Sequence, residues 1–340
     1  MDISSEFLFG YSLNTQRVGI SRELAAPLPN HTDAQDEQDF AESFDLVQEY
    51  LGMRNKLGKR YYLIDGFSFR RGIYRIHRFA DKTIKSAMTR VGRQIDDKDK
   101  THSTLAANAD SMPTFLDTLL AEVNDPNLLR SELLHLLIAG RDTVAVTLGW
   151  IFYRLARAPI VYSALHKEVM EIFGSSEAIE SGSAFLEKIT ECREVNNVIL
   201  ETLRLHPAIP INSRTAIRDT TLPRGGGSDG ELPVYIKRGT EVTYSVYAMH
   251  RNPAIWGPDA HEFKPGRWDG RKTVWEYLPF NGGPRACTGR HFAMMQLQYV
   301  VVRIIQQYRG LDCENPCRVI TNKLTLTCAS GNGVRVRFLR

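Results

Sequence analysis

Long apolar runs, an even set of cysteines and an excess of one charge are all missing from this sequence. No stretch of 18 or more consecutive apolar residues occurs, so we expect no segment of the chain to span a bilayer. Five cysteines in 340 residues argue for a reducing compartment rather than a disulfide framework. The net charge of +4 is too small to mark the whole chain as a nucleic-acid binder.

The composition is that of a globular protein with a large core. Hydrophobic residues make up 43% of the chain and charged residues 24%, which excludes a disordered chain. The length favours two domains, although a single large fold is also compatible with it. The first ten residues lack the basic start and the sustained apolar stretch of a signal peptide. They predict a helix with Ile3, Phe7 and Leu8 on one face.

Helical spacing of apolar residues dominates the chain. We expect helices over residues 40–53, 126–156, 159–173, 184–205 and 290–308, the fourth of them either continuous or broken. The helix at 126–156 begins with an Asp125-Pro126 cap and is apolar on all sides, which predicts a buried central helix. Residues 91–110 are polar and predict a loop or disorder.

Strand patterns are confined to the last third of the chain. Residues 234–236 and 242–246 flank a short turn and predict a hairpin. The glycine-rich stretch at 224–230 lacks the ending of a phosphate-binding loop and predicts a turn. Short strands are also expected over residues 318–328 and 334–338.

The most basic part of the chain is the stretch from Arg54 to Arg90. It holds eleven Lys or Arg residues and two acidic residues, and it contains an amphipathic helix with Ile76, Ala80 and Ile84 on its apolar side. A solvated helix face beside a loop is the favoured interpretation. A membrane-surface contact is the main alternative, because aromatic residues lie among the charges. Nucleic-acid binding is disfavoured because no binding motif accompanies the charge.

One cysteine has a distinctive setting. Cys287 comes directly before the last predicted helix, where free backbone N–H groups and the helix dipole favour a thiolate. Gly283 and Gly289 allow the backbone to approach a flat, bulky group, and Arg285 offers a guanidinium for a carboxylate. A thiolate held in such a loop suits an axial haem ligand. An isolated cysteine would instead be interpreted as a small buried hydrophobe.

Three motifs in order resemble those of one family. The spacing of Phe280, Gly283, Arg285, Cys287 and Gly289 matches the haem-binding signature of cytochromes P-450. The segment Ala-Gly-Arg-Asp-Thr at 139–143 and the Glu-Thr-Leu-Arg segment at 201–204, followed by Phe-Lys-Pro-Gly-Arg-Trp at 263–268, match two further motifs of that family. The sequence thus resembles the cytochrome P-450 superfamily over nearly its whole length.

The resemblance implies roles for specific residues. Cys287 would be the axial ligand of the haem iron, Phe280, Gly283 and Gly289 would complete its loop, and Arg285 and Arg214 would contact the haem propionates. Thr143 and Asp142 would deliver protons to bound dioxygen. The Thr143 hydroxyl can also bond back to the carbonyl of Ala139 and loosen the helix there. The plainer interpretations are a buried threonine and a surface aspartate.

A second group of residues implied by the resemblance is structural. Glu201 and Arg204 lie three residues apart on one helix face, close enough to pair. Arg267 would complete a buried Glu-Arg-Arg network like that of the family. Removing one member of such a network leaves a buried charge without its partner.

The resemblance also implies a fold and an activity. We expect a mainly α fold with a small β region, as one domain over residues 1–340. The activity would be that of a haem-thiolate monooxygenase, with haem b and O2, and with electrons from NADPH through NADPH-cytochrome P-450 reductase. The endoplasmic reticulum membrane, at its cytosolic face, is the implied location.

The resemblance further implies an apolar substrate. Residues 135–140, 208–212 and 329–333 match substrate-lining regions of the family and are mostly apolar. Within the superfamily the sequence is most similar to fungal n-alkane and fatty-acid hydroxylases, to which the basic region at 54–81 is also similar. An apolar aliphatic molecule is therefore the expected substrate.

The resemblance begins inside a helix, so about the first third of a typical family member has no counterpart in these 340 residues. That part normally carries a membrane helix, the first strands and a helix that contacts the haem propionates. We therefore expect an open wall at the haem pocket and an exposed strand edge after Ile211. The alternative to a working enzyme is a non-catalytic remnant, or an incomplete gene model, that does not form a working haem pocket.

Overall fold

The computed structural model describes residues 1–16, 34–100, 114–174, 182–314 and 321–340, with the backbone alone at 34, 91–100 and 183. Two compact units divide the chain, Met1–Asp142 and Thr143–Arg340, and the boundary falls inside one long helix. Helices make up most of the described chain, whose strands form small two-stranded sheets. The expected mainly α fold with a small β region is confirmed, whereas the single domain over residues 1–340 stays a prediction.

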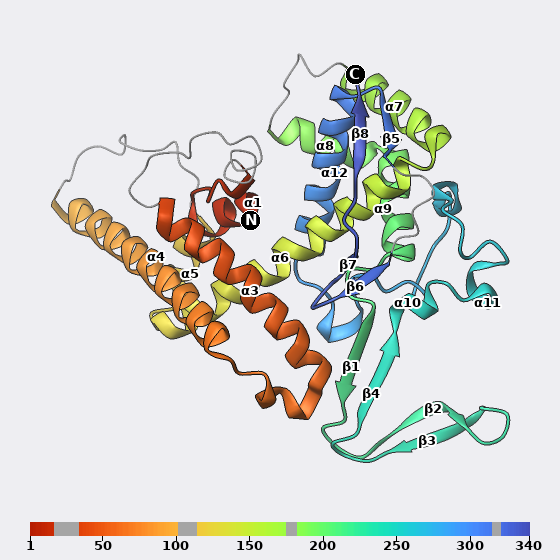
Figure 1. The fold of residues 1–340 in the computed structure, drawn as a ribbon, viewed down its shortest axis with the longest axis horizontal. Helices are drawn as coiled ribbons and strands as arrows, with labels where there is room; N and C mark the ends of the chain where they lie inside the picture. Colours follow the sequence, from red (N-terminus) through yellow and green to blue (C-terminus); the bar gives the residue numbers. More distant parts are fainter. Residues whose placement is uncertain (17–33, 101–113, 175–181, 315–320) are drawn as a thin grey trace. The chain divides into compact units, whose positions relative to one another are not determined.

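The first unit consists of helices around an apolar core. Its elements are α1 (Asp2–Phe9), α3 (Ala34–Leu57), the 3-10 helix η1 (Gly58–Leu63), α4 (Phe67–Lys100), α5 (Phe115–Glu122) and the first half of α6 (Pro126–Leu155) (Figure 1). Phe40, Phe44 and Val47 of α3 are buried, as their helical spacing predicted. Phe40 stacks on Phe79 of α4 with 4.3 Å between ring centroids. The apolar stripes of α3 and α4 therefore pack on each other.

Helix α1 buries a different face from the one expected. Leu8 and Phe9 are buried, whereas Ile3 and Phe7 are exposed. The face that packs inward also carries Ser5, whose hydroxyl is hydrogen-bonded to the main chain on two sides. The helix is confirmed, but Ile3, Phe7 and Leu8 do not share one environment, since only Leu8 is buried; Ser5 can be buried on the inward face because its hydroxyl is satisfied.

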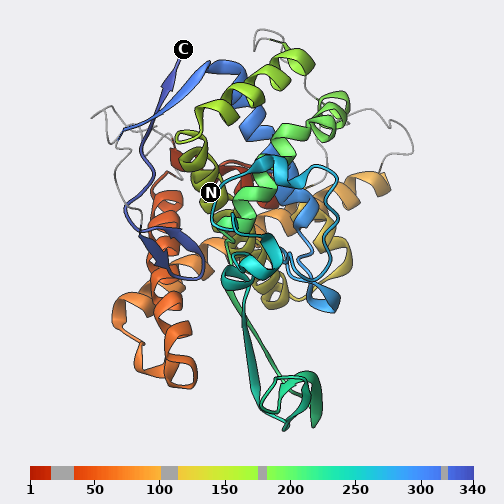
Figure 2. The ribbon, with the colours of Figure 1, turned by 90° about the vertical axis from the view of Figure 1, so that its right-hand side faces the viewer.

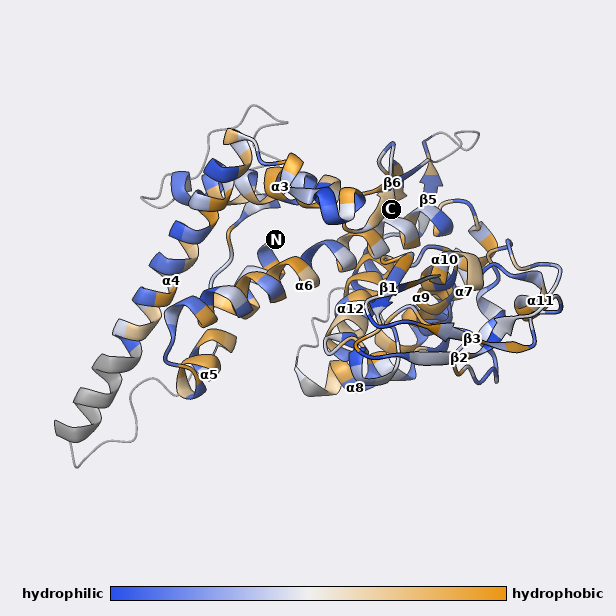
Figure 3. Ribbon diagram, turned by 90° about the horizontal axis from the view of Figure 1, so that it is seen from below, coloured by the Kyte–Doolittle hydropathy of each residue, from blue (hydrophilic) through white to orange (hydrophobic). Residues whose placement is uncertain are grey.

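Helix α4 has the predicted apolar side and is longer than expected. Ile76, Ala80 and Ile84 are buried, and polar residues alternate with apolar ones along the helix (Figure 3). The backbone stays helical to Lys100. The loop expected from residue 91 was therefore wrong up to residue 100, a stretch in which no proline interrupts the helix. Residues 101–110 lie outside the described part.

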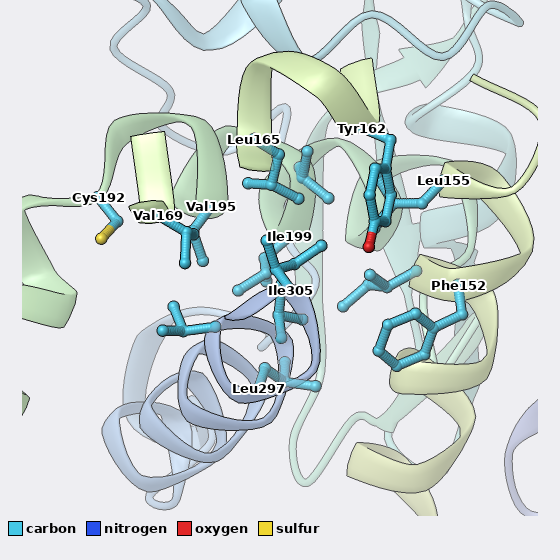
Figure 4. Packing of buried hydrophobic residues seen from close by; sticks show 14 of the residues in the cluster. Phe152, Leu155, Tyr162, Leu165, Val169, Cys192, Val195, Ile199, Leu297 and Ile305 are labelled. Atoms are coloured by element: carbon cyan, nitrogen blue, oxygen red, sulfur yellow. The ribbon is translucent and has the colours of Figure 1, made fainter. Parts of the chain in front are cut away.

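The second unit is built around α9 and α12. Its helical elements are the second half of α6, α7 (Pro159–Phe173), α8 (Ser183–Glu191), α9 (Arg193–Leu205), α10 (Val246–Met249), α11 (Pro253–Trp256), η2 (Pro265–Trp268), η3 (Gly283–Arg285) and α12 (Arg290–Gln307). Figure 4 shows Ile199 of α9 and Ile305 of α12 in the apolar core, with Leu165 of α7 beside them. The expected break in the fourth helix falls at Cys192, between α8 and α9.

The strands of the second unit pair as antiparallel ribbons. They are β1 (Ile211–Thr215), β2 (Thr220–Gly226), β3 (Leu232–Ile236), β4 (Glu241–Ser245), β5 (Gly310–Cys313), β6 (Asn322–Leu324), β7 (Cys328–Ser330) and β8 (Val336–Leu339). The pairs are β1 with β4, β2 with β3, β5 with β8 and β6 with β7. The second pair extends away from the helices of this unit (Figure 2).

The expected hairpin between residues 234–236 and 242–246 was wrong. Residues 234–236 fall in β3 and residues 242–245 in β4, which belong to different ribbons, while residue 246 begins α10. The turn expected at 224–230 was wrong for residues 224–226, which belong to β2; the turn that joins β2 to β3 follows Gly226 and contains glycines with positive φ, as hairpin turns require. The chain then crosses to the ribbon of β1, where Ala216 N–H donates to the carbonyl of Thr240 at 2.9 Å.

Helix α6 contributes to both units and begins at the expected cap, where the Asp125 carboxylate accepts from the Asn127 N–H at 2.9 Å. Leu133 and Leu137 are fully buried, but Leu136 is only half-buried, so this helix buries one stripe rather than all its sides. Among the described helices it alone is long and apolar enough to cross a membrane, with a mean hydropathy of 1.3. This is weak evidence, because the core helix of a soluble protein has the same properties.

Candidate functional site: the Glu201 cluster and the Cys287 loop

Two charged residues of α9 pair in the interior of the second unit. Arg204 donates from Nε to Glu201 Oε2 and from Nη2 to Oε1, both at 2.8 Å, and both side chains have 0% exposure. This two-point geometry matches the planar guanidinium to the carboxylate. We call these two residues, together with Asp259, Arg267 and Trp268, the Glu201 cluster.

The other members of the Glu201 cluster come from the chain around η2. Arg267 Nε lies 3.4 Å from Glu201 Oε1, and the Trp268 indole N–H donates to Oε2 at 3.1 Å. Arg267 also donates to Asp259 Oδ1 at 3.0 Å. Lys264 and Arg267 together hold the pKa of Asp259 at about 2. The structure thus brings Glu201, Arg204 and Arg267 together, and it adds Asp259 and Trp268, which the sequence analysis missed.

The N–H groups of Arg204 that do not contact Glu201 all donate to backbone carbonyls. Its Nη1 donates to the carbonyls of His250 and Ala260 at 2.7 and 2.6 Å, and its Nη2 donates to that of Glu262 at 3.0 Å. A buried guanidinium with all its donors satisfied fixes three chain segments at once. The cluster therefore joins α9 to the chain that leads to η2.

His250 connects the Glu201 cluster to the approach of Cys287. Its Nε2 accepts from the Leu278 N–H at 2.9 Å, and its Nδ1 lies 3.2 Å from the carbonyl of Arg204. Burial lowers the pKa of His250 to about 4, so the ring is neutral at pH 7. Nδ1 then carries the proton and donates to Arg204. The sequence analysis assigned no role to this histidine, since a lone His carries no motif.

We call residues 280–289 the Cys287 loop. The Cys287 N–H donates to the carbonyl of Phe280 at 2.9 Å, which closes the loop on itself. Phe280 is half-buried and packs against the core of the unit. Gly283 has φ +70°, a conformation that favours glycine, and Gly289 caps α12. Cys287 is exposed and has a free thiol.

Asn281 ties the Cys287 loop to the β1–β4 ribbon. Its Nδ2 donates to Asn212 Oδ1 at 3.0 Å, and its Oδ1 accepts from the Tyr244 hydroxyl at 2.6 Å. Asn212 and Tyr244 are register partners on the two strands. Asn281 has φ +59°, which asparagine tolerates better than most residues. The sequence analysis missed this residue, and its place inside the motif was the available signal.

The two arginines expected to bind propionates lie on different elements of the second unit. Arg285 lies in η3 and is exposed. Arg214 lies on β1, also exposed, with its guanidinium 5.9 Å from the ring centroid of Tyr244. Since Asn281 ties Tyr244 to the Cys287 loop, the strand of Arg214 is joined to that loop through one side chain. Both guanidinium groups are accessible to an anionic ligand.

The two expected proton-delivery residues lie on either side of the unit boundary in α6. Thr143 is half-buried, and its carbonyl accepts from the Thr147 hydroxyl at 2.7 Å. Asp142 is half-buried and lies 3.5 Å from Arg141, which also pairs with Asp45 at 2.6 Å. Burial raises the pKa of Asp142 above its usual value, while Arg141 acts in the opposite direction. The carboxyl group is thus shifted toward the neutral form.

The residues of the Cys287 loop fit a haem bound through the sulfur. A thiolate is a soft ligand suited to haem iron. A Cβ atom at Gly289 would lie 4.0 Å from Cys287 Sγ, so glycine leaves the space beside the sulfur clear. The exposed guanidinium groups of Arg214 and Arg285 have the charge and geometry to bind carboxylates.

Comparisons with known proteins agree with these features. A family model described as Cytochrome P450 matches residues 28–330. The chain is 40% identical over 337 residues to "Cytochrome P450 monooxygenase g430" of Fusarium sp, covering 99% of this chain and 57% of that protein. It is 36% identical over 337 residues to "Cytochrome P450 52A3-A" of Candida maltosa, covering 98% of this chain and 62% of that protein. The chain thus spans roughly three fifths of these relatives.

Solved structures show the same fold. The haem domain of cytochrome P450DA superposes with a TM-score of 0.73 at 21% identity, covering 100% of this chain and 66% of that one. A cytochrome P450 named CYP102L1 superposes with a TM-score of 0.72 at 22% identity, covering 100% of this chain and 69% of that one. Together with the motifs and the match to the family model, these likenesses identify the chain as a member of the cytochrome P450 family.

Proposed function

We propose that this chain carries the haem site of a monooxygenase that inserts one oxygen atom of O2 into an aliphatic C–H bond, the other atom leaving as water. The observation that carries the proposal is the exposed free thiol of Cys287, at the end of a self-closed loop directly before α12. Haem b, when bound through that thiolate, supplies the activation of O2. Membership of the cytochrome P450 family supports this assignment.

The chain's own residues bind the group and move protons. Cys287 would hold the iron, and Phe280, Gly283 and Gly289 would keep its loop in shape and clear of side chains. Arg285 and Arg214 would hold the propionates through charge-assisted hydrogen bonds. Asp142 and Thr143 would hold and pass on the protons that the reaction consumes. The raised pKa of Asp142 supports this role, because a carboxyl group that titrates nearer to neutral pH exchanges protons more readily.

We propose an n-alkane or a fatty acid as the substrate. The family resemblance assigns substrate-lining roles to residues 135–140, 208–212 and 329–333, which are together mostly apolar. An apolar lining binds an aliphatic chain by burying its surface and offers few polar groups to hold a polar substrate. The similarity to the Candida maltosa protein supports a function shared with fungal relatives.

We propose that electrons come from NADPH through NADPH-cytochrome P450 reductase. Arg285, Arg290 and His291 are exposed beside Cys287 and give this face a basic character. Such a face steers an acidic partner by long-range attraction, which salt screens. Reduction by the reductase should slow with added salt and with Arg290→Glu. An unchanged rate in both cases would exclude this docking face.

We propose that the chain acts at the cytosolic face of the endoplasmic reticulum membrane and that residues 54–90 contact the lipid surface. Tyr61, Tyr62, Leu63 and Phe67 are exposed among basic residues such as Arg60. Exposed aromatic and basic side chains on one short segment suit an anionic lipid interface. Replacing Tyr62 and Phe67 by serine should reduce co-sedimentation with phosphatidylserine vesicles. Equal sedimentation of the two proteins would exclude this contact.

The reduced, CO-bound difference spectrum of the purified chain tests the central proposal. A Soret band typical of a haem thiolate, lost in Cys287→Ala, is the expected result. Turnover assays with n-alkanes and fatty acids would then identify the substrate class. The absence of the band, or a band that the substitution leaves unchanged, would overturn the proposal and favour a chain without a working haem pocket.

A further inference from the structure

A three-residue stack joins α6 to the chain after α9. Trp150 of α6 is 2% exposed, and its ring lies parallel to that of His206, with 3.9 Å between centroids and 7° between planes. Arg154, one helical turn after Trp150, donates from Nε to His206 Nε2 at 2.9 Å. All three residues belong to the second unit.

The same tryptophan holds the start of β7. Its indole N–H donates to the carbonyl of Cys328 at 2.9 Å, and the Cys328 N–H donates to the carbonyl of Ala208 at 2.9 Å. Cys328 and Ala208 are both buried. Cys328 is therefore hydrogen-bonded through its carbonyl to α6 and through its N–H to Ala208, two residues after His206.

We propose that Trp150 is a positioning residue for the proposed reaction, which holds residues 208–212 and 329–333 at a fixed separation and thereby sets where the substrate lies. The inference rests on the proposed function only in taking these two segments as substrate-lining. Ala208 starts the first segment and Cys328 directly precedes the second. The hydrogen bonds through Cys328 thus fix the adjoining end of each.

The second segment is also placed against α6 at its far end. A Cβ atom at Gly149 would lie 3.8 Å from the side chain of Val334, so the chain that leaves the segment runs beside α6 as well. Within the segment, the Ser330 hydroxyl donates to the carbonyl of Gly333 at 2.8 Å. Residues 329–333 therefore consist of the end of β7 and the turn after it, and the chain lies beside one turn of α6 both before and after them.

The two ends of the first segment are held differently. Ile211 and Asn212 belong to β1 and pair with β4, whereas Ala208 lies between Pro207 and Pro210, which have no N–H group to donate. The stack supports it through a neutral His206. Burial and the nearby charge of Arg154 lower the pKa of His206 to about 2, which keeps Nε2 an acceptor for Arg154.

Trp150→Phe is the decisive variant, because it keeps an aromatic ring for the stack and removes the indole N–H, while its loss of ring volume is reproduced by the same substitution elsewhere. Trp256→Phe is the matched control, since Trp256 is 3% exposed and its indole donates to the carbonyl of Met249 at 3.1 Å, away from both segments. Hydrogen exchange, followed by mass spectrometry, should be about five- to tenfold faster at the Cys328 amide in Trp150→Phe alone. Equal exchange in the two variants would overturn the inference.

The second measurement is the ratio of terminal to subterminal hydroxylation of dodecanoate by the haem-loaded chain. We expect Trp150→Phe to change this ratio and Trp256→Phe to leave it at the parent value. Faster exchange at Cys328 with an unchanged ratio would overturn the positioning role. If the parent chain hydroxylates nothing, the proposed function fails. The exchange measurement then still decides whether Trp150 holds the two segments.

Discussion

The Glu201 cluster and the Cys287 loop lie in the same unit but differ in burial: the Glu201–Arg204 pair of the cluster is buried, and Cys287 and Arg285 of the loop are exposed. The cluster buries Glu201 and Arg204 completely and satisfies their hydrogen bonds with side chains and backbone carbonyls. The loop leaves Cys287 and Arg285 exposed and is held by a few hydrogen bonds. One region thus fixes the fold, while the other keeps its reactive groups accessible.

The difference shows that conspicuous residues in a sequence have two distinct physical roles. Buried charges tolerate no loss of a partner, because the remaining charge cannot be solvated. Exposed functional groups can be replaced with little effect on folding, because water solvates what remains. Asn281 and His250 connect the two regions to their surroundings with hydrogen bonds of intermediate burial. The loss of unfolding free energy caused by a substitution should therefore be largest at the buried charges, smaller at Asn281 and His250, and smallest at the exposed groups.

The largest effect is expected for Glu201→Gln. Loss of the carboxylate leaves the buried Arg204 without its countercharge and should reduce the free energy of unfolding by about 3–5 kcal/mol. Urea unfolding followed by circular dichroism measures this loss. Glu194→Gln is the matched control on the same helix, since Glu194 pairs with the exposed Arg193 at 3.1 Å. Its effect should stay below about 1 kcal/mol. Equal losses of unfolding free energy in the two variants would show that the buried pair of Glu201 and Arg204 contributes no more stability than an exposed ion pair.

Acidification should have the next largest effect. The pKa of His206 is about 2 and that of His250 about 4 in the folded chain, both below the unfolded value of about 6.5. The unfolded state therefore binds more protons below pH 6.5, so stability falls as the pH falls. Between pH 7 and pH 5 the loss should be about 2 kcal/mol for each histidine.

The variant His206→Gln separates the contribution of His206 to the pH dependence of stability from that of His250. A glutamine carbonyl can accept from Arg154 and does not titrate, so about half of the pH dependence should disappear. Urea unfolding at both pH values measures it. An undiminished pH dependence in the variant would mean that His206 is not held in its neutral form by the fold.

A smaller effect is expected at the Cys287 loop for Asn281→Gly. Glycine keeps the positive φ but loses the hydrogen bonds to Asn212 and Tyr244, which should lower the free energy of unfolding by about 1 kcal/mol. Asn14→Gly is the matched control, because Asn14 also has a positive φ, of 51°, and its side chain bonds only within its own turn. A loss larger than that of Glu201→Gln would reverse the comparison between the two regions.

Much of the architecture was predictable because local patterns decide helices. The spacing of Phe40, Phe44 and Val47 predicted α3, and the Asp125-Pro126 cap predicted the start of α6. Strand pairing was less predictable, since β3 and β4 look like a hairpin in the sequence but bond to different partners. Pairing depends on the geometry of the connecting turns and on which faces become buried, and neither is recorded within a single strand.

The candidate site shows the same division. The family motifs picked out Glu201, Arg204, Arg267 and Cys287 from the sequence, because charged pairs at helical spacing and a cysteine before a helix are local signals. Asp259, His250, Asn281 and Trp150 carry no local signal of this kind. Each acquires its role from a partner between 28 and 178 positions away, apart from Asp259, whose partner is 8 residues away.

The sequence by itself determined most of the helices, the family and the motifs to which we assign the chemistry, since these depend on neighbours within a few turns of chain. Only the tertiary structure decided which face of α1 is buried and which strands pair. It also placed Trp150 against Cys328 and Asn281 against the β1–β4 ribbon. The reason is physical: long-range hydrogen bonds and ring contacts form only when packing brings distant segments together, and no local pattern records which segments will meet.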